Sequence, residues 1–249
     1  MTEPRDRRQT VKRAAWRLGL ERPLRAAYEW RNPAARRDRT DNETLLRLLA
    51  FSLREDSNCI DVGCHRGEVL AEMLRLAPGG HHIAFEPVPA SHASLAADFP
   101  AADVRKAAVS DTDGEADFVV VPGLPSFSGL RERSYPGEQR TERVRVETCR
   151  LDGCLPAGYV PRLVKVDVEG AELHVLRGAR ETLRRHRPIV WFEHGAGGAD
   201  HYGTSPADVH RLLAGEIGMR IFDADGRGPY SERDFVAVFD EPIWSFVAH

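Results

Sequence analysis

The chain has 249 residues and a formal net charge of -3, which allows one large α/β domain and gives no overall case for nucleic acid binding. No apolar run has the length of a transmembrane helix, and the first residues lack the apolar region of a signal peptide. The four cysteines form neither a CxxC pair nor a zinc spacing, so we expect reduced thiols in a cytoplasmic protein.

The N-terminal segment differs in charge from the rest of the chain. Residues 1–40 carry twelve Arg and Lys against five Asp and Glu, and apolar residues recur near helical spacing over residues 10–30. We therefore expect a basic helical N-terminal extension over 1–40, followed by one larger domain over 41–249. The extension is interpreted either as a solvated helical cap or as a contact for an anionic partner or membrane surface.

Strands and helices are expected to alternate after this extension. The apolar pattern predicts helices at 42–53, 68–76 and 90–97, and strands at 58–62, 82–86 and 104–109. That rhythm predicts an α/β fold with a doubly wound, mostly parallel sheet. Strands at 116–121 and 143–148 then bracket a long loop at about 122–142, which we interpret as a lid over the ligand.

The second half of the chain resumes the alternation. Expected elements are a strand at 164–168, a helix at 171–185, a strand at 188–192, a helix at 205–213, and closing strands at 219–222, 235–239 and 244–247. The last two are expected to be antiparallel. No internal repeat and no domain linker is visible.

Three carboxylates follow the strand at 164–168. Asp167 and Glu169 stand at its C-terminal end and Glu172 in the next turn, where ligands bind in open α/β sheets. Acids in the first turn of a helix also complement its dipole, which is our preferred interpretation for Glu172, whereas Glu169 stays open. Lys165, one of three lysines, is either functional or a strand residue whose ammonium group reaches solvent.

A glycine loop runs from Asp61 through Gly63 and His65 to Gly67, between a strand and a helix. Glycines let the backbone approach a ligand closely, and the helix N-terminus offers unpaired N–H groups. A dinucleotide loop would have a glycine where His65 stands, and Asp61 would repel a pyrophosphate. The pattern favours a cofactor with a free ammonium group, such as S-adenosylmethionine.

Two further strand ends fit a nucleoside. Glu86, followed by Pro87, ends the next strand, where an acid commonly hydrogen-bonds the ribose hydroxyls. The third strand ends in Ser110 and Asp111. Asp111 either accepts a hydrogen bond from an adenine amino group or belongs to a turn.

Together these segments resemble the FkbM-type methyltransferase family over about residues 57–195. The resemblance rests on Asp61-Val-Gly-x-x-x-Gly67, Ala84-Phe-Glu-Pro-Val-Pro89, Ala108-Val-Ser-Asp111 with Gly114, Leu151-Asp152, Lys165-Val-Asp-Val-Glu-Gly-Ala-Glu172 with Leu176-Arg-Gly178, and Pro188 through Glu193. It implies a Rossmann-like class I methyltransferase that uses S-adenosylmethionine. The predicted cofactor-binding residues are Asp61, Gly63, His65, Gly67, Glu86, Pro87, Ser110, Asp111 and Asp167. One departure is Cys64-His65, where the family commonly has Ala-Asn, and this leaves the role of His65 open.

The methyl acceptor must lose a proton, because an alcohol is a poor nucleophile until a base or a metal activates it. In one arrangement Asp167 joins Glu193 and His194, from the neighbouring strand end, around a divalent metal such as Mg²⁺. Metal-dependent class I O-methyltransferases resemble this layout. In the other, no metal binds and His194, Glu193 or Lys165 acts as the general base.

The leading hypothesis is an S-adenosylmethionine-dependent O-methyltransferase acting on a hydroxyl of a small metabolite, sugar or natural product. Alternatives are a nicotinamide-dependent oxidoreductase and a noncatalytic nucleoside-cofactor-binding module. The expected substrate contacts are Ser126, Ser128, Glu169, His201 and Tyr202. The acceptor's identity and the formation of a homo-oligomer stay open.

Overall fold

The computed structural model describes residues 28–249, and the chain divides into compact units between Glu43 and Thr44. Most of the predicted basic extension, residues 1–27, lies outside the described residues. Helix α3 (Pro33–Ser52) crosses the division, and its second half brings Leu45 and Leu49 into the core of the larger unit. The predicted boundary at residue 40 stays a prediction. No helix within residues 28–249 has the length and apolar character needed to cross a membrane.

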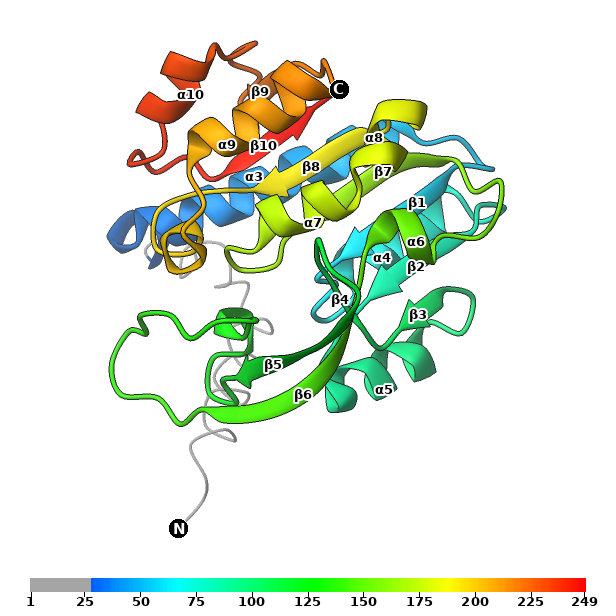
Figure 1. The fold of residues 1–249 in the computed structure, drawn as a ribbon, viewed down its shortest axis with the longest axis horizontal. Coiled ribbons are helices and arrows are strands. Elements are labelled where there is room, and N and C mark those ends of the chain that lie inside the picture. The colour runs from blue at the N-terminus through cyan, green and yellow to red at the C-terminus, as the bar shows by residue number, and fades with distance from the viewer. Residues whose placement is uncertain (1–27) are drawn as a thin grey trace, which may run out of the picture. The chain divides into compact units, whose positions relative to one another are not determined.

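A seven-stranded sheet forms the centre of the larger unit, in the order β3-β2-β1-β7-β8-β10-β9 (Figure 1). Its strands are β1 (Asn58–Val62), β2 (His82–Phe85), β3 (Asp103–Arg105), β7 (Pro161–Val166), β8 (Ile189–Glu193), β9 (Ile221–Asp223) and β10 (Ser245–Ala248). β1 pairs in parallel with β2 and β7, and β8 pairs in parallel with β7, whereas β10 is antiparallel to β8 and β9. The predicted doubly wound, mostly parallel sheet with an antiparallel closing strand is confirmed.

Helices cover both faces of this sheet, because its strands present apolar side chains on both faces. They are α4 (Glu68–Leu76), α5 (Pro89–Asp98), α6 (Leu151–Cys154), α7 (Glu172–Gly178), α8 (Arg180–His186), α9 (Pro206–His210) and α10 (Glu232–Ala237). The chain also forms the 3₁₀ helices η1 (Pro125–Phe127) and η2 (Ala199–Tyr202) and the π-helix η3 (Arg211–Glu216). One core joins Val62, Val164 and Val166 to α6–α10. Another joins Cys59 and Leu163 to α3 and α4.

A smaller sheet of order β4-β6-β5 stands beside the main one. It contains β4 (Ala108–Val109), β5 (Gly114–Val120) and β6 (Glu142–Cys149). Figure 1 shows the β5–β6 ribbon projecting from the main sheet with the predicted lid loop between its two strands. The strand expected at 104–109 is therefore split, since β3 belongs to the main sheet and β4 to the smaller one.

The strand expected at 235–239 is wrong, because residues 235–237 form the second half of helix α10. The Ser231 hydroxyl accepts the Asp234 N–H at 3.2 Å, which caps the helix. A five-residue apolar run has no periodicity long enough to separate a strand from a buried helix. The helix expected at 171–185 also divides at Ala179, into α7 and α8.

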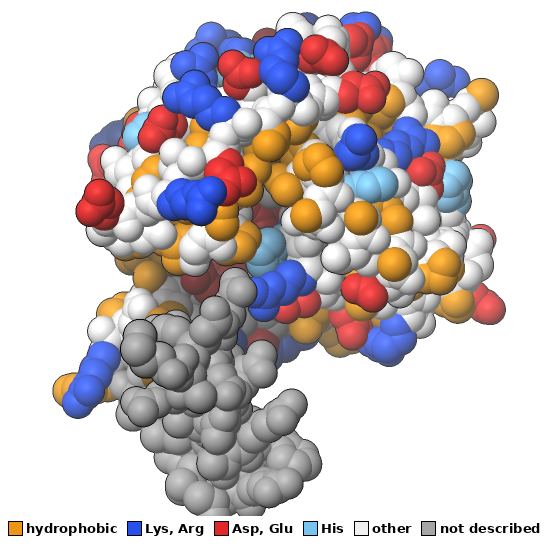
Figure 2. Space-filling model, turned by 90° about the horizontal axis from the view of Figure 1, so that it is seen from below, with side chains coloured by type: hydrophobic (Ala, Val, Ile, Leu, Met, Phe, Trp, Pro, Cys, Tyr) orange, Lys and Arg blue, Asp and Glu red, His pale blue; other side chains and the backbone are white. Residues whose placement is uncertain are grey.

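Charges are mixed on the surface. On the face shown in Figure 2, Lys and Arg side chains are interspersed with Asp and Glu side chains, in keeping with the small net charge.

Candidate active site

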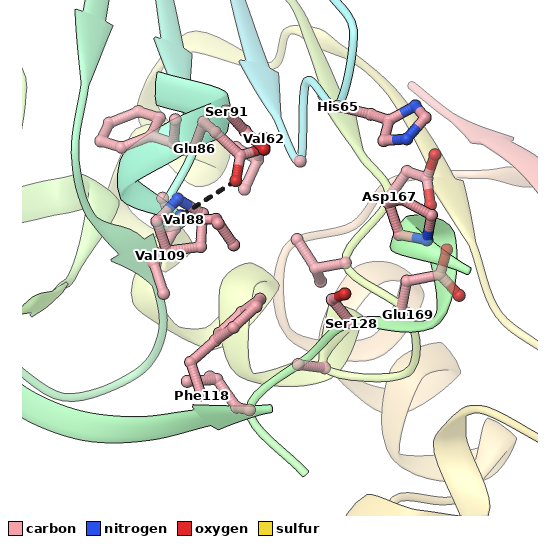
Figure 3. A pocket seen from close by; sticks show the side chains of 18 of the residues that line it. Val62, His65, Glu86, Val88, Ser91, Val109, Phe118, Ser128, Asp167 and Glu169 are labelled. Atoms are coloured by element: carbon pink, nitrogen blue, oxygen red, sulfur yellow. Dashed lines mark hydrogen bonds between the residues drawn. The ribbon is translucent and has the colours of Figure 1, made fainter. Parts of the chain in front are cut away.

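A pocket opens at the carboxyl ends of β1, β2 and β7, where the fold brings together segments far apart in the sequence. Eight of the predicted site residues line it: Gly63, His65, Glu86, Pro87, Ser126, Ser128, Asp167 and Glu169. Figure 3 shows Glu86 on one side of this pocket and His65, Asp167 and Glu169 on the opposite side. We call the side that carries Glu86 the nucleoside-like side, because its residues fit a nucleoside, and the side that carries Asp167 and Glu169 the acidic side.

The glycine loop is packed tightly against the end of β7. Gly63 has φ +82°, and a Cβ there would fall 1.8 Å from the backbone oxygen of Asp167. Gly67 has φ +76°, and a Cβ there would fall 2.4 Å from the Phe99 ring. These positions require glycine for conformation and for space, and the close approach brings the loop to Asp167.

The ammonium group of Lys165 links the glycine loop to the carboxyl ends of β1 and β7. Its Nζ donates to the Gly63 carbonyl at 2.7 Å and lies 3.2 Å from Asp61 Oδ1 and 3.4 Å from Asp167 Oδ2. Burial alone would lower the pKa of Lys165, but the charges of Asp61 and Asp167 outweigh it and raise the pKa above its usual value. The ammonium group is therefore enclosed, with 7% of the side chain exposed, and does not reach solvent.

Asp61 lies beneath the pocket and is fully buried. Apart from Lys165, its carboxylate oxygens have no hydrogen-bond partner among the described residues. Burial raises the pKa of Asp61, and the Lys165 charge opposes this rise. Asp61 therefore supports the pocket indirectly: it pairs with Lys165, and Lys165 binds the Gly63 carbonyl. The position of Asp61 in the sequence did not show this indirect role.

Glu86 supplies the polar group on the nucleoside-like side. Its carboxylate accepts the Val88 N–H at 3.0 Å, and burial raises its pKa to about 7. Val88, Val109 and Phe118 line the pocket beside it. A carboxylate next to an apolar wall fits a ribose and an adenine, so these residues fit the nucleoside part of S-adenosylmethionine.

Asp167 and Glu169 form the acidic side. Glu169 has φ +60°, and its carboxylate is ion-paired with Arg133 Nη1 of the lid. Burial and the charge of Asp167 raise the pKa of Glu169 to about 8. The buried Glu172 carboxylate accepts the N–H groups of Val168 at 3.1 Å and Gly170 at 2.9 Å. Glu172 therefore holds the turn that carries the two pocket acids.

Glu193 ends β8 and His194 follows it, and neither residue lines this pocket. Burial, followed by the charge of Asp167, raises the pKa of Glu193 well above its usual value. The His194 ring is packed against Phe235 and Phe239, with centroid separations of 6.2 Å and 5.2 Å. Neither ring nitrogen has a hydrogen-bond partner in the described chain, and burial lowers the pKa of His194 to about 4.

The predicted metal ligands are therefore not assembled. Across residues 28–249, no group of three or more His, Cys, Asp and Glu side chains could hold a metal ion. The apolar surroundings of His194 do not fit the predicted set of Asp167, Glu193 and His194.

Four other predicted residues lie beside the pocket and do not line it. Ser110 and Asp111 follow β4, and Asp111 Oδ2 lies 2.9 Å from His174 Nδ1. Two residues of η2 contact the lid backbone: Tyr202 Oη accepts the Arg131 N–H at 3.1 Å, and His201 Nε2 accepts the Ser134 N–H at 3.4 Å. In this structure His201 and Tyr202 hold the loop between β5 and β6.

The apolar wall and Arg133 were not among the predicted site residues. Phe118 alternates along β5 with residues on its opposite face, a pattern that predicts the strand but not which ligand the strand faces. Arg133 was one of three loop arginines, with Arg131 and Arg140, weighed as contacts for an acidic or phosphorylated substrate, but a solvated loop was the preferred interpretation.

Comparisons with known proteins show which family the sequence matches. The sequence model of the Methyltransferase FkbM domain family matches residues 61–220. The chain is 31% identical over 158 residues to the 2-O-methyltransferase NoeI of Sinorhizobium fredii, covering 57% of this chain and 65% of NoeI. It is 27% identical over 184 residues to the hexuronic acid methyltransferase AglP of Haloferax volcanii, covering 72% of this chain and 70% of AglP. A solved FkbM methyltransferase from Methylobacillus flagellatus is 16% identical, with a TM-score of 0.49 over 79% of this chain and 44% of that chain.

Proposed function

Because the chain belongs to the FkbM methyltransferase family, we propose that it transfers a methyl group from S-adenosylmethionine to a hydroxyl oxygen of a small metabolite, sugar or natural product. Membership of this family supports a methyltransferase over the oxidoreductase and the noncatalytic module weighed from the sequence. The observation that carries the proposal is one pocket with Glu86 on one side and Asp167 and Glu169 opposite. The relatives named as a 2-O-methyltransferase and a hexuronic acid methyltransferase support a hydroxylated, sugar-like acceptor.

The residues of the nucleoside-like side would hold the cofactor. Glu86 would accept hydrogen bonds from the ribose hydroxyls, and Val88, Val109 and Phe118 would cover the adenine. The loop from Gly63 to Gly67 would contact the amino-acid part. When bound, the cofactor supplies the activated methyl group and its own leaving group.

The protein must then position the acceptor and accept its proton. We assign the proton to Glu169, because a base is most effective when its pKa lies near the working pH, and burial with the Asp167 charge brings the pKa of Glu169 to about 8. Asp167 lines the pocket beside it and is held by Lys165. We assign Lys165 a positioning role, since its ammonium group is enclosed by Asp61, Gly63 and Asp167.

Two substitutions test this assignment: Glu169→Gln and Asp167→Asn. Each is expected to lower kcat about 100-fold or more, the usual contribution of a positioned base, with little change in affinity for S-adenosylhomocysteine. Turnover would be followed with methyl-labelled S-adenosylmethionine and a panel of hydroxylated acceptors, and affinity by calorimetry. Glu132→Gln, on an exposed lid acid, is the matched control. Full activity in both variants would show that the acidic side is not the reaction site.

A further inference from the structure

A second, open pocket of about 590 Å³ lies at the amino ends of the strands, on the opposite edge of the main sheet from the candidate active site. Arg162 stands near the start of β7, Arg187 two residues before β8 and Arg220 directly before β9. Because β10 is antiparallel to β8, the end of β10 brings His249 to the same edge. The topology therefore gathers three arginines and a histidine from four segments of the chain around one pocket.

Arg187 is held in place by backbone carbonyl groups. It has φ +46°, and its guanidinium donates from Nη1 to the Ile217 carbonyl at 2.8 Å and from Nη2 to the Gly218 carbonyl at 2.7 Å. Two such bonds fix the plane of the guanidinium. One N–H on each of these nitrogens, and the N–H of Nε, have no acceptor within residues 28–249 and are available to a ligand.

Arg220 and His249 form another side of the pocket. Arg220 Nη2 lies 3.5 Å from His249 Nε2, and the Arg220 guanidinium lies 5.5 Å from the centre of the Phe222 ring. The His249 ring stacks on the same phenylalanine with a centroid separation of 5.5 Å. The aromatic ring therefore orients both groups without using the donors of the guanidinium.

Arg162 and a set of apolar side chains complete the lining. Arg162 Nε donates to the Ser52 carbonyl at the end of α3, at 3.1 Å, and its two Nη groups have no partner among the described residues. Leu48 of α3 lines the pocket with Ile189 and Val247 of the sheet. The pocket thus offers N–H donors from three cations beside an apolar surface.

The positive charge of this pocket is not balanced by the protein. None of the three arginines forms an ion pair with an Asp or Glu side chain in the part of the chain that the structure describes, whereas Arg180 on α8 pairs with Glu216 at 2.9 Å. Burial, followed by the charges of Arg220 and Arg187, lowers the pKa of His249. Both cations therefore act on one ring, and a bound anion would offset their mutual repulsion.

We propose that Arg162, Arg187, Arg220 and His249 form a binding site for the phosphate group of an organic phosphate, separate from the methyl-transfer pocket. Guanidinium groups suit this ligand because their N–H groups match the spacing of phosphate oxygens. Leu48, Ile189 and Val247 would contact the organic part, and the volume of the pocket is within the range of small-molecule sites. Soluble phosphate esters and lipid headgroups both carry such a group, and separate probes distinguish these sources.

The soluble arm is a calorimetric titration of the full chain with phenyl phosphate, inorganic phosphate and phenol. Phenyl phosphate is expected to bind at least as tightly as inorganic phosphate, more weakly at high salt, and phenol is not expected to bind. Arg187→Gln and Arg220→Gln should each weaken phenyl phosphate about 10-fold, the usual effect of losing a hydrogen bond to a charged group, and Arg220→Lys should weaken it less. Arg233→Gln, on an exposed arginine of α10, is the matched control and should leave the affinity unchanged.

The lipid arm is cosedimentation of the full chain with phosphatidylcholine vesicles that contain or lack phosphatidic acid. Capture that requires phosphatidic acid and is lost in Arg220→Gln would assign the phosphate to a lipid headgroup. Binding of phenyl phosphate without such capture would assign it to a soluble ester. Either result supports the site.

No binding of phenyl phosphate, inorganic phosphate or phosphatidic acid vesicles to the wild-type chain would overturn the inference. Wild-type affinity in both Arg187→Gln and Arg220→Gln would overturn it as well, because the phosphate would then lie elsewhere. Circular dichroism checks the fold of each variant. Arg187→Gln gives up two bonds to backbone carbonyls, whereas Arg220→Gln gives up none, so Arg220→Gln decides the test if Arg187→Gln does not fold.

Discussion

Lys165→Met tests how the fold holds the pocket together. Methionine keeps the length of the side chain and removes the ammonium group, which leaves Asp61 fully buried with no other partner in residues 28–249. The Gly63 carbonyl also loses its donor at 2.7 Å. Breaking a buried ion pair by removing one member costs about 3–5 kcal/mol, so we expect the free energy of unfolding to fall by about that amount.

Urea unfolding at pH 7, followed by circular dichroism, measures this change. The double variant Lys165→Met with Asp61→Asn should recover about 1–3 kcal/mol, because the amide carries no charge that needs compensation. The pH dependence gives a second check. Without Lys165, burial holds the pKa of Asp61 above its unfolded value, so the deficit of the variant should shrink as the pH falls toward 4.

A loss below about 1 kcal/mol in Lys165→Met would refute the reasoning, because an ion pair worth so little behaves like a solvent-exposed one. Strictly additive effects in the double variant would refute it as well, since they would show that Lys165 and Asp61 do not interact.

Three further outcomes follow from the site. Burial raises the pKa of Glu86 to about 7, and only the ionised carboxylate accepts hydrogen bonds from both ribose hydroxyls. Affinity for S-adenosylhomocysteine, measured by calorimetry, should therefore weaken as the pH falls below 7. The Glu86→Gln variant should bind about 10-fold more weakly and lose this pH dependence. Gly63→Ala should abolish cofactor binding because its Cβ would fall 1.8 Å from a backbone oxygen; retained affinity would mean the loop adapts. His194→Phe should keep turnover within about twofold if the ring only packs, whereas a loss of about 10-fold or more would make His194 catalytic. The pKa of His194 falls from 6.5 to about 4, so wild-type stability is lost below pH 6.5, and the variant should be more stable by about 2 kcal/mol in urea unfolding at pH 5.

Local apolar patterns in the sequence predicted the strands whose carboxyl ends carry the pocket. Strands β1, β2, β7, β8 and β10 were predicted near their observed bounds. Apolar runs between glycine and proline residues form strands with little dependence on distant parts of the chain. Their carboxyl ends then had to meet, so Gly63, Glu86 and Asp167 were predicted as one site and do line one pocket. Confirmation of the family rests on the same segments, since the match covers residues 61–220.

Side-chain partners across strands could not be read this way. Asp61 and Lys165 are aligned between β1 and β7, a register set by two strands about 100 residues apart. The sequence shows two separate charged residues, and only the strand pairing shows that the charges of Asp61 and Lys165 compensate each other in the interior. His194 is a similar case, because Phe235 reaches its ring through helix α10, where a strand was expected.

The amino-acid sequence by itself therefore determined the type of fold, the edge of the sheet that carries the pocket and the residues at its strand ends. Tertiary structure decided which of those residues face the ligand and which support it. Glu169 lines the pocket and Glu172 holds the turn beneath it, although they lie three residues apart in one motif. The physical reason is that burial and pairing depend on neighbours from other elements, which local periodicity does not encode.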